Sequence, residues 1–268
     1  MYDRYLQKDT REVTGINTDE ALWESVAADL RDDITTGKLK PGDAIPTEMD
    51  LADDRGMSRT TIRRALTQLT NEGLITEGKG RLGRHVAERT LLRFDAVRSE
   101  SRAFVAERAG LGTDAYVTTA HEQGHTGRQD IKVTNEAATP DMAARLGLEP
   151  GERVVVRQRV RYLDDKPNDL NDTYYPADIA DGTPITHPDD VKIGTIALMA
   201  SLGYIQDHFA DEVTARMPTP DEARALRMPA GVPLIIQIRT GYTPERPVKV
   251  TVTKWRGDRV RLVWEFEG

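Results

Sequence analysis

The chain has 268 residues, of which 30% are charged and 38% hydrophobic, the composition of a globular protein with room for two domains. It contains neither a long apolar run nor the apolar core of a signal peptide, so we expect a cytoplasmic protein without membrane contact. The absence of cysteine excludes disulfides, a zinc ribbon and a thiol nucleophile. With a net charge of −7, any contact with nucleic acid must come from a local basic patch.

The first segment, residues 1–17, is polar and has no periodicity. We interpret it as a flexible arm. The alternative is an arm whose Arg4, Lys8 and Arg11 touch a DNA backbone.

Two helices are predicted next. The first begins at Asp19, because Leu22, Val26, Leu30 and Ile34 recur four residues apart, and it ends at Gly37. Thr47 caps a short second helix, with Asp50 in the capping-box position. Gly56 terminates it, so a tight turn leads into the helix that follows.

The third helix, Ser58–Leu69, is predicted from its N-cap and its two faces. One face is an apolar stripe at helical spacing: Ile62, Ala65, Leu66 and Leu69. The other face is basic and polar: Arg59, Thr60, Arg63 and Arg64. Arginine and threonine can contact phosphates and base edges, which is the chemistry of a recognition helix. The alternative is an ordinary surface helix with a solvated charged face.

A β-hairpin is predicted after this helix. Leu74 and Ile75 start a strand and His85–Val86 return. The tip between them is basic and rich in glycine: Lys79, Gly80, Arg81 and Arg84. It could cradle an anion, but it lacks Walker spacing. Helix-turn-helix plus hairpin is a winged helix, which we assign to residues 18–87.

An arginine-rich linker, 88–98, leads to a second domain, 99–268, of the α+β class. Helices are predicted at 139–148, 195–202 and 220–226. Strands are predicted at 115–123, 129–135, 153–163, 170–175, 205–215, 232–242, 248–255 and 260–266.

The second domain contains an internal repeat. Residues 139–167 align without a gap with residues 219–247, an offset of 80. Both copies begin with Thr-Pro-Asp, residues that favour the start of a helix. The alternative interpretation is that the two copies share only this helix start. The match continues to the pair Arg159 and Arg239, beyond the helix. We therefore predict two β-rich halves related by a pseudo-twofold axis, with a cleft between them.

The ordered motifs of residues 23–86 resemble the winged helix of the GntR family of bacterial regulators. They are the GKLKPGD turn, the P-x-E opening of the second helix, SRTTIRRAL and NEGLI. The resemblance implies that Arg59, Thr60 and Arg63 face DNA and that Lys79–Gly80 enters the minor groove. The full set of predicted DNA-binding residues is Thr47, Ser58, Arg59, Thr60, Arg63, Arg64, Lys79, Gly80, Arg81 and Arg84. Two departures stand out: Met49 replaces a basic residue that is common in the family, and the wing is longer.

The order of elements in the second domain resembles the effector domain of the HutC-type branch of that family, whose fold is similar to chorismate lyase. The matching stretches are RQRVRYLDDKP, TYYP, T-P-x-E/D-A and WRGDR. The resemblance implies that Arg159 and Arg161 line a pocket for an anionic effector. Strand alternation places both on one face. The alternative is a pair of salt-bridged arginines at a sheet edge.

Other pocket positions depart from that branch. Asn171 and Lys249 match positions that are acidic there, so a typical amino-sugar phosphate is an unsuitable effector. Phe94, Tyr174 and Tyr242 could give a stacking surface, although each is equally suited to the core.

The prediction is a transcription regulator, a homodimeric repressor that a small, anionic effector releases from double-stranded operator DNA. We predict no catalytic residue, cofactor or metal, because the five histidines form no convincing site and no nucleophile elbow is present. One alternative is a DNA-binding repressor whose second domain only dimerises. The other is an enzyme that regulates its own gene.

Overall fold

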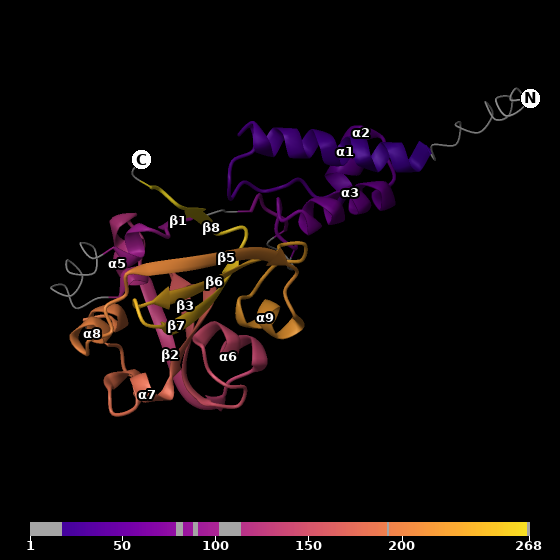
Figure 1. Ribbon diagram of the computed structural model, residues 1–268. Coiled ribbons are helices and arrows are strands. Elements are labelled where there is room, and N and C mark those ends of the chain that lie inside the picture. The colour runs from indigo at the N-terminus through magenta and orange to yellow at the C-terminus, as the bar shows by residue number, and fades with distance from the viewer. Residues whose placement is uncertain (1–17, 79–82, 88–90, 102–113, 192, 267–268) are drawn as a thin grey trace, which may run out of the picture. The chain divides into compact units, whose positions relative to one another are not determined.

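The computed structural model describes residues 18–78, 83–87, 91–101, 114–191 and 193–266. The chain forms two compact units, which divide at residues 88 and 89 (Figure 1). In the described ranges, no helix has the length and apolar character needed to cross a bilayer. The predicted arm, 1–17, lies outside these ranges. The domain limits drawn from the sequence stay a prediction.

The first unit contains the helices α1 (Thr18–Thr35), α2 (Glu48–Arg55) and α3 (Arg59–Asn71), as predicted. Thr47 caps α2 in a complete capping box, and the Ser58 hydroxyl accepts a hydrogen bond from the backbone at the start of α3. These caps satisfy amides that would otherwise lack partners, and so fix where both helices begin.

The stripe on α3 holds the first unit together. Its four apolar residues are fully buried, and they pack with Val26 and Leu30 of α1 and Leu51 of α2. The opposite face of α3 is exposed, as predicted. The base of the hairpin is confirmed too, since Ile75 pairs with Val86 in antiparallel fashion. The hairpin tip, Lys79–Arg81, lies outside the described residues.

The second unit is built on a six-stranded antiparallel sheet in the order β2-β3-β4-β7-β6-β5. The strands are β2 (Gly127–Ala137), β3 (Arg153–Leu163), β4 (Lys166–Pro176), β5 (His208–Arg216), β6 (Leu234–Tyr242) and β7 (Pro247–Arg256). Helices and short turns surround it: α6 (Pro140–Leu146), α7 (Ala177–Ala180), η3 (Pro184–Thr186), α8 (Thr195–Ser201) and α9 (Pro220–Ala225). The predicted α+β fold is confirmed.

The strand order confirms the internal repeat, because it reads alike from both edges: β2, α6, β3 and β4 correspond to β5, α9, β6 and β7. Thr139 and Thr219 cap the two helices, each followed by proline. Irregular register falls after Arg161 in one half and after Gly241 in the other, again offset by 80. The halves join through β4 and β7 in one continuous sheet. The predicted cleft corresponds to a cavity over one face of this shared sheet, which residues of both halves line.

Two segments differ from their predicted structure. Residues 115–123, predicted as a strand, form the helix α5 (Ala115–Glu122). Its β-branched residues suggested a strand, but the Asp114 carboxylate accepts a hydrogen bond from the Tyr116 amide and starts a helix. The predicted linker contributes the strand β1 (Leu92–Asp95), which pairs in parallel with β8 (Val260–Val263), and is followed by η2 (Arg98–Glu100).

Removing part of the α3 stripe should loosen the first unit selectively. We expect Leu66→Ala to destabilise it by about 2–5 kcal/mol, because the fully buried side chain leaves a cavity. Hydrogen exchange should show faster opening of α1 and α3 but not of the sheet. The exposed neighbour Thr67→Ala is the control. Equal exchange in both variants would contradict this role.

Candidate functional site

The exposed face of α3 is held toward the hairpin by an acidic residue. Arg63 donates to Glu48 through Nε at 3.1 Å, and Arg84 donates to the other oxygen of the same carboxylate at 3.1 Å. The hydrogen bond from Arg63 lowers the pKa of Glu48 although burial opposes it. Glu48 therefore stays ionised and orients two of the predicted DNA-contacting arginines. The sequence prediction did not assign it this role.

The other predicted DNA-contacting residues take different positions. Arg59 and Thr60 are exposed at the start of α3. Arg64 lies over the Trp23 ring at 4.6 Å, an arrangement that restrains a cation on an aromatic face. The hydroxyls of Thr47 and Ser58 serve as helix caps, so these two side chains have a local structural task. Met49 is exposed.

The second unit contains a cavity of about 90 Å³ over one face of the sheet. Strands β3, β4, β6 and β7, α5, and the segment from β1 to η2 contribute to its wall. The predicted residues Phe94, Arg159, Arg161, Asn171 and Lys249 all line it. Residues of both halves of the repeat therefore meet around one cavity.

Arg159 is buried but its guanidinium is bonded only to neutral oxygens within the described part of the chain. Its Nη1 donates to Asn171 Oδ1 at 3.1 Å and to Thr173 Oγ1 at 3.0 Å, and its Nε has no partner there. Its strand β3 lies inside the sheet, with β2 at the edge. The alternative of a salt-bridged arginine at a sheet edge is therefore wrong for Arg159.

Arg161 has a more acidic environment than Arg159. Its guanidinium nitrogens lie 3.9 Å from Asp114 and 3.8 Å from Asp169, and the group stands 5.1 Å from the centre of the Tyr116 ring. Burial raises the pKa of Asp169 to about 6, although the charge of Arg161 opposes this. Two carboxylates therefore lie within 4 Å of the Arg161 guanidinium.

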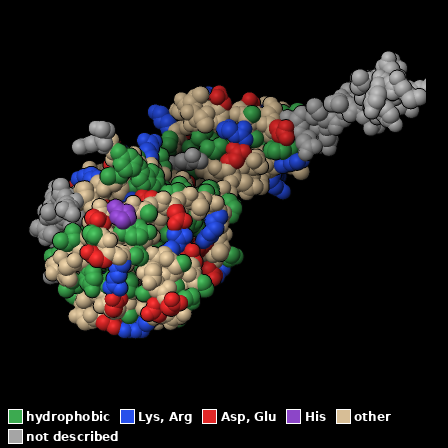
Figure 2. Space-filling view, in the orientation of Figure 1, with side chains coloured by type: hydrophobic (Ala, Val, Ile, Leu, Met, Phe, Trp, Pro, Cys, Tyr) green, Lys and Arg blue, Asp and Glu red, His purple; other side chains and the backbone are tan. Residues whose placement is uncertain are grey.

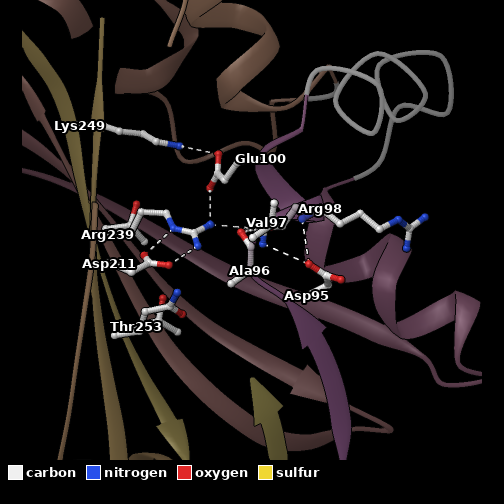
Figure 3. A network of polar contacts seen from close by, with 12 residues as sticks. Asp95, Ala96, Val97, Arg98, Glu100, Asp211, Arg239, Lys249 and Thr253 are labelled. Atoms are coloured by element: carbon white, nitrogen blue, oxygen red, sulfur yellow. Dashed lines mark hydrogen bonds and ion pairs between the residues drawn. The ribbon is translucent and has the colours of Figure 1, made fainter. Parts of the chain in front are cut away.

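A second group of charges lies in the other half of the repeat (Figure 3). Arg239 donates to Asp211 through Nε at 2.7 Å and to Glu100 through Nη1 at 3.3 Å. Lys249 donates to the other oxygen of Glu100 at 3.4 Å. Burial alone lowers the pKa of Arg239, but the two carboxylates outweigh it and raise that pKa. Sequence reasoning missed Arg239 as a pocket residue, although the repeat matched it to Arg159.

Two predicted pocket aromatics do not reach the cavity. Tyr174 points to the other face of β4, where it packs with the cluster under α6, because alternation turns it away from Thr173 and Tyr175. Tyr242 stacks on His208, with ring centroids 4.4 Å apart, beyond the register shift that ends regular alternation in β6. Of the three predicted aromatics, Phe94 alone lines the cavity, with its ring 5.0 Å from that of Trp255.

Both domains of the chain, the winged helix and the sheet that bears the cavity, match known protein families. Residues 22–81 match the family described as "Bacterial regulatory proteins, gntR family", and residues 122–261, more than half of the chain, match the UTRA domain. The chain belongs to the GntR family. Its UTRA domain places this regulator in the HutC-type branch.

Known relatives of this GntR regulator resemble it over most of their length. An HTH-type transcriptional regulator of Streptomyces coelicolor is 28% identical, covering 91% of this chain and 92% of its own. The mannosyl-D-glycerate transport/metabolism system repressor MngR of Escherichia coli is 27% identical, covering 82% and 85%. The crystal structure of a putative GntR-family regulator matches with a TM-score of 0.63 at 26% identity, covering 92% and 98%. These proteins are regulators, so this chain is a DNA-binding transcription regulator and not an enzyme.

The buried Asp169 gives the second unit a testable pH dependence. Its pKa rises from 3.8 to about 6 on folding, so the folded state holds the proton more tightly and stability falls as pH rises through this interval. We expect Asp169→Asn to remove this loss. Its unfolding free energy relative to the wild type should increase by roughly 2 kcal/mol between about pH 4 and about pH 7.

Chemical denaturation across that pH range provides the measurement. Asp165→Asn, on an exposed residue of the neighbouring turn, is the matched control and should show no such trend. A constant difference between Asp169→Asn and the wild type would contradict the assignment.

Proposed function

We propose that this regulator is a homodimeric repressor that an anionic small molecule releases from its operator. The observation that carries the proposal is Arg159, a cation that is 6% exposed, lines the cavity and is held by neutral groups within the described residues. A buried charge is costly unless an opposite charge or several hydrogen bonds compensate it. An acidic group of a ligand would supply that compensation.

Its neighbour Arg157 shows why Arg159 is distinctive. Arg157 is fully buried too, but it donates to three backbone carbonyls, those of Ile185, His187 and Asp189, and so anchors a loop. Arg157 does not line the cavity. Arg157 therefore stabilises the loop, whereas Arg159 is available to bind a ligand in the cavity.

Neutral groups at the cavity support the same proposal. Tyr116 and Tyr175 line it, and their hydroxyls are buried and lack a hydrogen-bond partner within the described part of the chain. Buried polar groups normally have partners, so these hydroxyls are suited to a polar ligand. Asn171 and Lys249, where the branch has acidic residues, favour an acid over a sugar.

The DNA-binding side of the proposal rests on α3. In a dimer, two such helices can enter successive major grooves of a near-palindromic operator. Relatives such as MngR are named repressors, which supports repression here. An effector that binds one domain arrangement more tightly shifts the population and lowers operator affinity.

We expect Arg63 to read a base. Arg63→Ala should weaken binding to a selected operator duplex by about 1–3 kcal/mol and binding to random duplex much less. Fluorescence anisotropy at fixed salt measures both affinities. Arg128→Ala, on the exposed surface of β2, is the control. Equal losses on both duplexes would reassign Arg63 to phosphate contact.

We expect Arg159 to hold an anion. Inorganic phosphate should raise the melting temperature of Arg159→Ala much less than that of the wild type, while operator affinity without phosphate stays unchanged. Arg153→Ala, on the same strand but exposed and paired with Asp181, is the matched control. Phosphate stabilisation retained in Arg159→Ala would refute this role and favour a second domain that only dimerises.

A further inference from the structure

Glu100 places its carboxylate between two cations of the cavity wall. Its two oxygens accept from Arg239 at 3.3 Å and from Lys249 at 3.4 Å, as Figure 3 shows. The Lys249 side chain is 5% exposed, so its ammonium group is largely removed from water. Within the described residues, Glu100 is the carboxylate that balances this lysine.

The contacts of Glu100 are longer than those of the other carboxylate in the network. Asp211 receives Arg239 Nε at 2.7 Å and Trp264 Nε1 at 2.7 Å, and it lies opposite Arg239 in the pairing of β5 with β6. Charge-assisted hydrogen bonds are typically about 2.7–2.9 Å long. By this measure Arg239 binds Asp211 more strongly than it binds Glu100. A competing anion would replace Glu100 before it replaced Asp211.

The internal repeat relates this cluster to Arg159. Arg159 and Arg239 occupy equivalent positions, and the residues opposite them in the register, Asn171 and Thr251, are equivalent as well. All four line one cavity. The two halves differ in what the arginine contacts, since Arg159 contacts neutral groups and Arg239 contacts a carboxylate carried by η2.

We propose that Arg239 and Lys249 form a second anion subsite and that Glu100 occupies it as an internal substitute for the ligand. The effector is then a small molecule with two acidic groups, carboxylate or phosphate, one for each half of the repeat. This inference rests on the proposed effector function of the cavity. Backbones of β3 and β6 are three strand spacings apart, about 14 Å, so the two acidic groups belong to separate parts of the ligand.

The Glu100 side chain has space to move away from Arg239 and Lys249. Glu100 and Arg239 also line a second, wider hollow of about 870 Å³, bounded by Val97, Phe209 and Trp264 among others. Displaced from the cations, Glu100 can turn toward this hollow without entering the core. Its segment follows β1, the first strand after the winged helix in the chain.

Phosphate binding by the full-length protein tests the subsite. Glu100→Gln removes the competing charge and keeps the side-chain shape, so we expect its dissociation constant for inorganic phosphate, by calorimetry, to be about tenfold lower than that of the wild type. Glu122→Gln is the matched control, because Glu122 pairs with Arg98 near the surface. Adding Lys249→Met to Glu100→Gln should abolish the gain.

Unchanged affinity in Glu100→Gln, or an equal gain in Glu122→Gln, would overturn the second subsite. Loss of phosphate binding in Arg159→Ala with no gain in Glu100→Gln would leave the proposed function standing and refute only this inference. If Glu100→Gln binds phosphate more tightly while Arg159→Ala binds it as well as the wild type, the second subsite stands and the role of Arg159 is refuted.

A second measurement covers the case in which Glu100→Gln does not fold. In the wild type, phosphate should accelerate hydrogen exchange in the peptide 92–101, because displacing Glu100 frees the turn that Asp95 caps through the amides of Val97 and Arg98. Exchange in β4, which carries no part of this turn, should not accelerate. Unchanged or slower exchange in 92–101 would contradict the proposal.

Discussion

The structure of the second unit depends on how positive charge is buried on one face of its sheet. Arg157, Arg159 and Arg161 alternate along β3, and Arg239 occupies the equivalent strand of the other half. Each is compensated differently: by backbone carbonyls, by neutral side chains, by distant carboxylates, and by Asp211 with Glu100. Buried charge is costly without compensation, and Arg159 lines the cavity with neutral side chains as its partners, which is why we propose it as the site for an acidic group of a ligand.

Charged side chains on the surface are arranged differently from those around the cavity. On the visible face of the larger unit, acidic and basic side chains are interspersed and no single sign dominates (Figure 2). In the smaller unit, one carboxylate, Glu48, holds Arg63 and Arg84 together. DNA phosphates would compete with Glu48 for the exposed Arg63 and the half-buried Arg84, whereas a ligand of the second unit would compete with Glu100 inside a cavity. Solvent screens the first competition far more than the second.

Sequence patterns predicted the winged helix well because its elements begin at side-chain caps and share one apolar stripe, both of which are local signals. They also predicted the six strands of the sheet, because alternation and β-branched content are local signals too. They failed at α5, where Asp114 outweighs β-branched residues, and at Tyr174 and Tyr242, which depend on which face of a strand looks into the cavity. Glu100 and Asp211 could not be found as site residues, because they approach Arg239 from distant parts of the chain.

The family, the order of the elements and the equivalence of Arg159 and Arg239 follow from the linear chain, because motifs, periodicity and an offset of 80 residues are properties of the sequence. The folded arrangement was needed to show that the two halves share one sheet through β4 and β7, and hence that both arginines line a single cavity. It also decided what each arginine contacts. Partners of a buried charge are set by which strands become neighbours, and that depends on packing across the whole domain.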